Sequence, residues 1–283
     1  MKSLLLLFAR RYIAGTGRQD AIRVALGLNK AGIGATIDNL GENVKNASEA
    51  NDSVKEYLGL LDDIQSAGAD STISLKLTHL GLDLSKELAF KNAETIIKKA
   101  FESGNSVRLD MEGSEYTQRT IETFLELRQK YPNVGIAIQS SLLRSRKDAR
   151  MIAEKSGSIR LVKGAYKEPP EVAFQDKKEV DASFEAIMKE LLLSGTRPAI
   201  ATHDERLINE AKRFAADKNL SKNSFDFEML LGIKRKLQIE LAAEGYKVRV
   251  YIPYGRNWLP YTIRRLRERK ENIWFVVKNI FER

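Results

Sequence analysis

Short apolar runs rich in β-branched residues alternate with longer segments of helical period along most of the chain, and this alternation restricts the fold more than any other feature. Eight strand–helix units follow one another without a break. Such a series is typical of a (β/α)8 barrel, whereas an open doubly wound sheet usually stops at five or six strands. The expected strands begin at Gly34, Thr72, Ser106, Val134, Ser158, Arg197, Ser224 and Lys247.

The helical segments between these strands carry recognisable ends. Gly104, Gly157 and Gly245 follow three of them, as glycine commonly does at the end of a helix, and Asp204 is placed to cap another. No linker, repeat or change of composition divides the chain. We therefore expect an α/β fold, a single (β/α)8 TIM-type barrel over residues 34–283 with a further C-terminal helix, after a short N-terminal helical extension over residues 1–33. The expected helices cover residues 54–66, 85–103, 117–130, 147–155, a segment through Phe184 and Leu193, 204–216, 234–243 and a last stretch from about Trp258.

Composition excludes several kinds of site. The chain has 283 residues with no cysteine, two histidines and a net charge of +9. The lack of cysteine excludes a disulfide framework, thiolate metal ligands and a cysteine nucleophile. His79 and His203 alone cannot form a histidine-rich metal site, so no metal is expected. The basic residues are spread through apparent helices, which favours a solvated surface over a nucleic-acid interface.

The N-terminal segment contains a short apolar run, Leu4–Ala9, that Arg10 and Arg11 end. This is well short of the ~20 residues that span a bilayer, and no small-residue cleavage site follows it. We expect a short helix that packs on the protein, in a cytoplasmic enzyme. Contact of this helix with the inner face of a membrane is the alternative.

Polar residues stand near the carboxyl ends of several expected strands, where a barrel strand covered on both faces should be apolar. A buried unpaired charge costs several kcal/mol, so such residues must pair with one another or meet a ligand. One case would indicate a structural ion pair, but a series in the same relative place predicts a polar pocket at the barrel mouth. The residues are Lys76, Asp110, Gln139, Arg160, Lys163, Thr202, His203 and Tyr251.

The last expected helix places Tyr261, Arg264, Arg265 and Glu268 on one face, at spacings of three, four and seven residues. Two adjacent arginines beside a tyrosine can clamp a carboxylate, because arginine binds carboxylates through two hydrogen bonds. A solvated face with an Arg264–Glu268 pair is the alternative, and position in the fold does not decide between them. The neighbouring stripe of Leu259, Ile263 and Leu266 is expected to pack on the barrel.

Common nucleotide and metal motifs are missing. The glycine-containing segments at Gly15 and Gly32 lack the third glycine of the dinucleotide fingerprint, and there is no P-loop and no HExxH motif.

Seven segments together resemble the proline dehydrogenase family. They are LKLTHLG, RLDMEGS, IQS, RLVKGAYKEP, ATHDERLI, FEMLLGIKRKL and RVYIPYGRNWLPYTIRRLRER, and they run in the family's order from about Gly34 to the C-terminus. The resemblance implies a (β/α)8 barrel that binds FAD without covalent attachment and without a Rossmann domain. It further implies oxidation of L-proline to 1-pyrroline-5-carboxylate, the first step of proline degradation, by an enzyme of the monofunctional bacterial type. The partners that it implies are a quinone that accepts the electrons, transient contact with a 1-pyrroline-5-carboxylate dehydrogenase, and peripheral contact with a membrane.

The same resemblance assigns roles to residues. Asp110 and Arg160 would be catalytic, with Arg160 near the flavin N5, where negative charge develops as hydride arrives. Glu228 stands in a matching segment and receives no role. The substrate-binding residues would be Lys76, Tyr251, Tyr261, Arg264, Arg265 and Glu268. The cofactor-binding residues would be Met111, Gln139, Arg160, Val162, Lys163, Gly164, Ala165, Thr202 and His203.

Two rival functions remain at this point. A Schiff-base aldolase also uses a (β/α)8 barrel, and Lys163 or Lys76 would serve as its nucleophile if neighbouring cations lowered the lysine pKa. A basic module that binds nucleic acid or anionic lipid would need its cations on one face. The sequence spreads its charge instead, and no nucleic-acid partner is expected.

Overall fold

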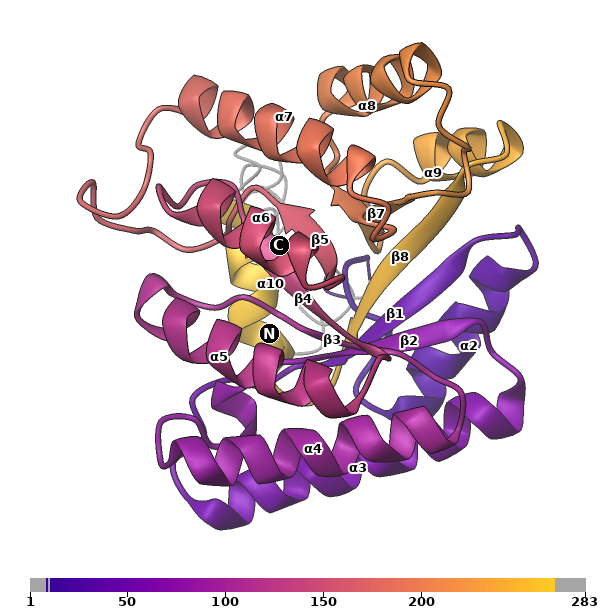
Figure 1. Cartoon of the computed structure of the whole chain (residues 1–283). Helices are drawn as coiled ribbons and strands as arrows, with labels where there is room; N and C mark the ends of the chain where they lie inside the picture. Colours follow the sequence, from indigo (N-terminus) through magenta and orange to yellow (C-terminus); the bar gives the residue numbers. More distant parts are fainter. Residues whose placement is uncertain (1–8, 10, 268–283) are drawn as a thin grey trace, which may run out of the picture.

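Eight parallel strands form a closed barrel in chain order, with β8 pairing to β1 (Figure 1). The computed structural model describes residues 9 and 11–267, and for residues 264–267 it describes the helix but not the side chains. Where the barrel closes, Thr36 pairs with Tyr251 and Asp38 pairs with Pro253. The predicted (β/α)8 fold is confirmed. The strands are β1 (Gly34–Asn39), β2 (Ser71–Leu75), β3 (Val107–Leu109), β4 (Val134–Gln139), β5 (Ser158–Val162), β6 (Ala199–Ala201), β7 (Asp226–Leu230) and β8 (Lys247–Tyr254).

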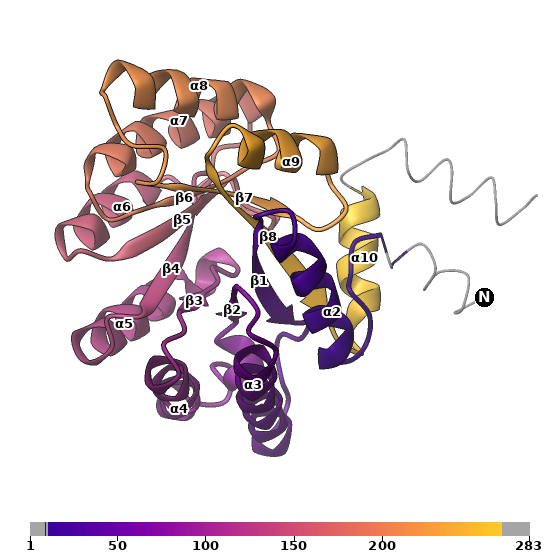
Figure 2. The same cartoon turned by 90° about the vertical axis from the view of Figure 1, so that its right-hand side faces the viewer.

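Helices α2 to α9 surround the strands (Figure 2). α2 precedes β1 and packs on both β8 and β1, so it occupies the position that the helix after the last strand has in a regular barrel. α10 instead lies at the end of the barrel where the strands finish (Figure 1). The division expected at residue 33 stays a prediction. The elements are α2 (Arg18–Asn29), α3 (Ala47–Ala67), α4 (Lys86–Glu102), α5 (Ser114–Lys130), α6 (Ser145–Glu154), α7 (Lys177–Leu193), α8 (Glu205–Asp217), α9 (Arg235–Ala243), α10 (Trp258–Arg267) and a 3-10 turn, η1 (Thr78–Leu80).

Side-chain caps explain where several helices begin. The Asp204 carboxylate accepts a hydrogen bond from the backbone N–H of Arg206 at 3.1 Å, which confirms the predicted cap of α8. Asn46 caps α3 in the same way by accepting from the N–H of Glu49. The sequence predicts α3 only from Val54, because its first two turns are polar and carry no apolar period.

Polar side chains occur within the barrel as well as at its mouth: Thr36 and Thr72 share a hydrogen bond, and Arg108 Nη1 donates to the carbonyl of Ser158 at 3.2 Å. Every residue of β4 is buried, as expected for a parallel strand that helices and barrel interior cover on both faces. Lys76, Asp110 and Thr202 directly follow β2, β3 and β6. Charged and polar side chains therefore also stand at the ends of the strands, which is where (β/α)8 enzymes carry their active sites.

A second apolar cluster lies at the rim of this end. Tyr12, Ile13 and Tyr261 are buried in it, and the backbone N–H of Ala14 donates to the carbonyl of Pro253 at 2.9 Å. The segment before α2 therefore packs against α10. Its other members are Ala9, Leu40 and Ile233, with Leu230 and Trp258 partly buried against it.

The predicted packing stripe of α10 is wrong for Leu259 and Ile263, and the side chain of its third member, Leu266, lies outside the described residues. Leu259 and Ile263 are 41% and 39% exposed, whereas Tyr261 and Thr262 are buried. The helix packs through Tyr261, which joins the apolar cluster at the rim and also lines the cavity at the barrel mouth. Within residues 9 and 11–267, no helix combines the length and the apolar character needed to cross a bilayer.

Candidate active site

A cavity of about 410 Å³ opens at the carboxyl ends of the strands. Thirteen predicted site residues line it together, which is the strongest agreement between sequence and structure in this molecule. They are Lys76, Asp110, Met111, Gln139, Arg160, Val162, Lys163, Gly164, Ala165, Thr202, His203, Tyr251 and Tyr261. The predicted clamp residues Arg264 and Arg265 lie in α10, but their side chains, like all of Glu268, lie outside the described residues.

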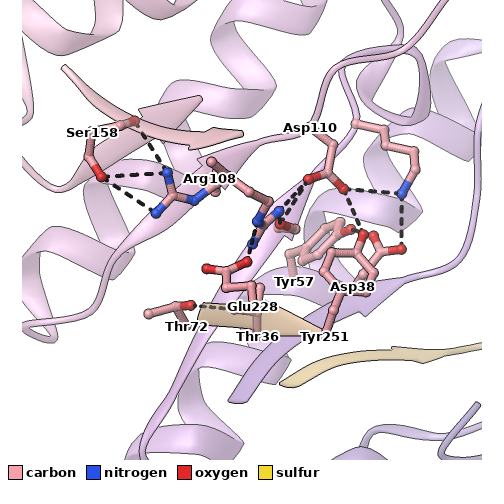
Figure 3. Close-up of polar contacts among 12 residues, drawn as sticks. Thr36, Asp38, Tyr57, Thr72, Arg108, Asp110, Ser158, Glu228 and Tyr251 are labelled. Atoms are coloured by element: carbon pink, nitrogen blue, oxygen red, sulfur yellow. Dashed lines mark hydrogen bonds and ion pairs between the residues drawn. The ribbon is translucent and has the colours of Figure 1, made fainter. Parts of the chain in front are cut away.

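Asp110 is the centre of the polar network on one wall (Figure 3). Its Oδ2 accepts from Tyr251 Oη at 2.6 Å and from Lys76 Nζ at 3.5 Å. Its Oδ1 accepts from Arg160 Nη1 at 2.8 Å and from Ser74 Oγ at 3.1 Å. Three of these donors belong to strands β2, β5 and β8, and the fourth, Lys76, directly follows β2. Together they fix the carboxylate in one orientation.

Lys76 and Asp38 form the buried ion pair beside it. Lys76 Nζ lies 2.9 Å from Asp38 Oδ2, and the Asp38 side chain is only 1% exposed. The Oδ1 of Asp38 accepts from Tyr57 Oη at 3.4 Å. Asp38 lines the same cavity and is a residue that the sequence prediction missed.

Arg160 is held from three sides. Its Nε donates to Glu228 Oε2, and its Nη1 donates to Ser74 Oγ at 2.9 Å as well as to Asp110. The guanidinium lies over the Tyr251 ring, 5.3 Å from the ring centroid. Its Nη2 is buried and has no hydrogen-bond partner in the part of the chain that the structure describes. This one donor is left for a ligand, since a buried unpaired donor is otherwise costly.

The charges of this network set the pKa of its members. Burial alone lowers the pKa of Lys76, but Asp38 and Asp110 outweigh burial and raise it, so Lys76 is an ammonium. Burial alone raises the pKa of Asp110, but Lys76 and Arg160 outweigh it, so the pKa is lowered and Asp110 is ionised. For Asp38 burial prevails over Lys76, and its pKa is raised.

These charges argue against the aldolase reading. A Schiff-base lysine needs a lowered pKa, which neighbouring cations would give to Lys76 or Lys163. Lys76 instead has a raised pKa beside two carboxylates. Lys163 Nζ lies 2.6 Å from Asp181 Oδ1 and 2.9 Å from Asp204 Oδ2.

Other residues that line the cavity are held by contacts outside the Asp110 network. Gly164 has a φ of +121°, and a Cβ at this position would collide with Ser141 Oγ. Only glycine therefore fits at this point of the cavity wall. Gln139 Nε2 donates to the carbonyl of Glu112 at 2.8 Å, and His203 Nε2 accepts from the N–H of Leu230 at 2.9 Å. Both side chains are thereby fixed at the cavity wall.

Two further carboxylates line the cavity, one that the sequence analysis did not name and one to which it assigned no role. Asp38 lies in GATIDNL, a carboxylate inside an expected strand, which is the same signal that marked Asp110. Glu228 lies in FDFEML and pairs with Arg160 inside the barrel. Among the described residues, no group of three or more histidine, aspartate or glutamate side chains is arranged to hold a metal ion.

Comparison with known proteins identifies the family. A family model described as proline dehydrogenase matches residues 21–278. The chain is 40% identical to proline dehydrogenase 1 of Bacillus subtilis subsp. natto over 277 residues, which cover 98% of this chain and 92% of that protein. The chain belongs to the proline dehydrogenase family. Another family member, the proline dehydrogenase of Deinococcus radiodurans, is 38% identical over 97% of this chain and 90% of its own length.

Solved structures share the fold of this chain. The crystal structure of proline utilization A (PutA) from Bdellovibrio bacteriovorus, inactivated by N-propargylglycine, superposes with a TM-score of 0.88 at 27% identity. It covers 94% of this chain, which spans only 33% of that PutA chain. A PutA from Bradyrhizobium japonicum shares the fold, with a TM-score of 0.75 at 20% identity. The predictions of the family and of a proline dehydrogenase enzyme are confirmed.

Proposed function

We propose that this chain oxidises L-proline to 1-pyrroline-5-carboxylate with non-covalently bound FAD, and passes the electrons to a quinone. The observation that carries the proposal is the cavity at the barrel mouth. It gathers thirteen residues that the family resemblance assigns to proline and flavin, in a chain that belongs to the family. When bound, FAD supplies the acceptor for the hydride that leaves C5 of proline, at its N5.

The residues at the cavity fit a flavin. Gly164 allows the tight backbone of the cavity wall beside Ser141, and Lys163 brings a cation to the wall that suits the FAD phosphates. Arg160 offers a buried donor, Nη2, with no other described partner, and a donor of this kind suits the place where a ligand gains negative charge. We infer that these residues hold FAD together with Met111, Gln139, Val162, Ala165, Thr202 and His203.

The wall around Asp110 suits the substrate. Hydride loss leaves positive charge on the C–N unit of proline, and an ionised carboxylate fixed by four donors favours that charge without reorganising. We assign the proline carboxylate to Arg264 and Arg265, with Lys76 as a further cation. Glu268, Tyr251 and Tyr261 would complete the enclosure of the ring.

The resemblance extends the proposal to the surroundings of the enzyme. We propose transient contact with a 1-pyrroline-5-carboxylate dehydrogenase, which would consume the product. We also propose a cytoplasmic location with peripheral contact at the inner face of the membrane, because a quinone acceptor resides in the bilayer.

Turnover tests the function directly. With L-proline and a short-chain quinone, the FAD-loaded protein should form a cyclic imine, which o-aminobenzaldehyde traps as a coloured adduct. D-Proline is the matched control, because it has the same ring and charges with the opposite arrangement at the α-carbon. Absence of the adduct from L-proline in a flavin-loaded sample would contradict the proposal.

A further inference from the structure

Glu228 is a buried carboxylate at the active site without an assigned role. It belongs to β7, its side chain is 4% exposed, and it lines the cavity. Its Oε2 accepts from Arg160 Nε. An ion pair with both partners 4% exposed is electrostatically strong, because little water screens it.

Arg160 therefore lies between two carboxylates. Glu228 binds its Nε, and Asp110 binds its Nη1, while Nη2 has no partner among the described residues. Burial disfavours the charged guanidinium, but Glu228 and Asp110 outweigh burial, and the pKa of Arg160 is raised. Arg160 is thus always a cation, and its positive charge is more than matched by its two anionic neighbours.

The neighbours of Arg160 affect the direction of its Nη2 donor and the strength of its positive field in different ways. The contacts with Glu228, Ser74 and Asp110 fix the plane of the guanidinium and so fix the direction of the Nη2 donor. The two carboxylates at the same time weaken the positive field that a ligand beside Nη2 experiences. A ligand there receives a well-placed hydrogen bond but less stabilisation of negative charge than a lone arginine would give.

From this geometry we infer that Glu228 is a positioning residue that acts through Arg160 to lower the reduction potential of the bound flavin. The inference rests on the proposed function, in which Arg160 adjoins the flavin N5. A reduced flavin gains negative charge, and the carboxylate of Glu228 opposes that gain. A lower potential favours transfer of the electrons onward to the acceptor.

The test is the midpoint potential of the Glu228→Gln variant, measured by reduction with dithionite against a reference dye. Glutamine retains an oxygen that accepts from Arg160 Nε, so this substitution removes the charge and keeps the hydrogen bond. We expect reduction to become at least tenfold more favourable, which equals a rise of about 30 mV for a two-electron couple. Glu228→Asp retains the charge and should keep the potential near that of the wild type.

Asp226→Asn is the matched control. Asp226 belongs to the same strand, two residues nearer the opposite end of the barrel, and it does not line the cavity. The Asp226→Asn substitution also removes one carboxylate from β7, and it should leave the midpoint potential of the flavin unchanged. An unchanged potential in flavin-loaded Glu228→Gln, or an equal rise in Asp226→Asn, would overturn the inference.

The measurement is independent of proline. If the wild-type flavin is reduced by dithionite but not by L-proline, the proposed function fails while the potentials of the variants still test the role of Glu228. If Glu228→Gln does not retain flavin, Glu228→Asp decides instead. A rise of about 30 mV in a variant that keeps the charge would then contradict the inference.

Discussion

At the scale of single residues, the site is organised by charges that hold one another in place. Asp110 accepts four hydrogen bonds, and two of its donors, Lys76 and Arg160, are also bound by other buried carboxylates. A network of this kind orients its members. Removal of any one partner destabilises the fold at this site, because the remaining charges are left buried and unpaired.

Asp110→Ala should slow the reduction of the flavin by proline about 100-fold or more, because it removes a preorganised charge that favours the cationic product. Flavin content and far-UV circular dichroism should stay near those of the wild type, since apolar packing around the strands holds the barrel. Rapid-mixing reduction under anaerobic conditions measures the rate. A wild-type rate in this variant would remove Asp110 from the catalytic residues.

Arg264→Met and Arg265→Met should each raise the KM for proline about 10- to 100-fold, which corresponds to loss of a charge-assisted hydrogen bond. Flavin content should not change, because the clamp is assigned to the substrate. Arg213→Met is a control for the loss of a helical arginine, since Arg213 lies in α8 and pairs with Glu210 at the surface. An unaltered KM in both variants would contradict the clamp and favour the alternative, in which this face of α10 is solvated and does not bind proline.

Most residues that line the cavity could be predicted from the sequence, because polar residues at strand ends are conspicuous and the family resemblance added Met111, Val162, Gly164 and Ala165. Asp38 was not named and Glu228 received no role, for different reasons. Asp38 lies in a strand that was noted only for its apolar residues, and the role of Glu228 depends on Arg160, which is 68 residues away in the chain. Pairing across a barrel is a property of closure and register, and neither is visible in a local sequence pattern.

At the scale of elements, the position of α10 over the cavity depends on its packing against the segment that precedes α2. The cluster of Tyr12, Ile13 and Tyr261 joins the two at the rim of the cavity. The sequence predicted that α10 exists and where it begins, but assigned its packing to the wrong residues. Leu259 and Ile263 are apolar and yet exposed, because hydrophobicity alone does not reveal which neighbour a helix meets.

Ile13→Ala should raise the KM for proline several-fold while kcat falls less, because α10 would be held less firmly over the mouth. The lost methyl groups should also cost about 2–4 kcal/mol of stability. Ile152→Ala is the matched control: Ile152 is equally buried but lies in α6, away from the rim. If both variants lose stability and both keep the wild-type KM, the rim cluster has no part in holding α10.

At the scale of the whole molecule, the alternation of strands and helices was sufficient to predict the barrel. The position of α2 was not predictable, because an amphipathic helix before the first strand looks the same whether it extends the fold or completes its outer ring. Its packing on β8 and β1 shows that the outer layer is closed by the beginning of the chain.

The stability of the whole fold should carry a pH dependence from Glu112. Burial raises the pKa of its carboxyl from a usual 4.5 to about 7, and the bonds from Thr78 only partly offset burial. Between these values the folded state keeps the proton and the unfolded state loses it, so this group makes the free energy of unfolding fall by about 3 kcal/mol as pH rises, and the loss levels off above pH 7.

Glu112→Gln removes this ionisation and keeps a group that bonds to Thr78. Its stability relative to the wild type should therefore rise between pH 5 and pH 7 and then stay constant, as measured by urea unfolding. A difference that does not vary with pH would show that Glu112 is ionised in the folded protein throughout.

The most direct test of the account is anaerobic addition of L-proline to the purified, FAD-loaded protein while the visible spectrum is recorded. We predict flavin absorption bands that bleach on addition of L-proline and return when a quinone is added. Flavin bands that persist with L-proline would contradict proline as the electron donor, and a protein that cannot be loaded with FAD would contradict the assignment of the cavity.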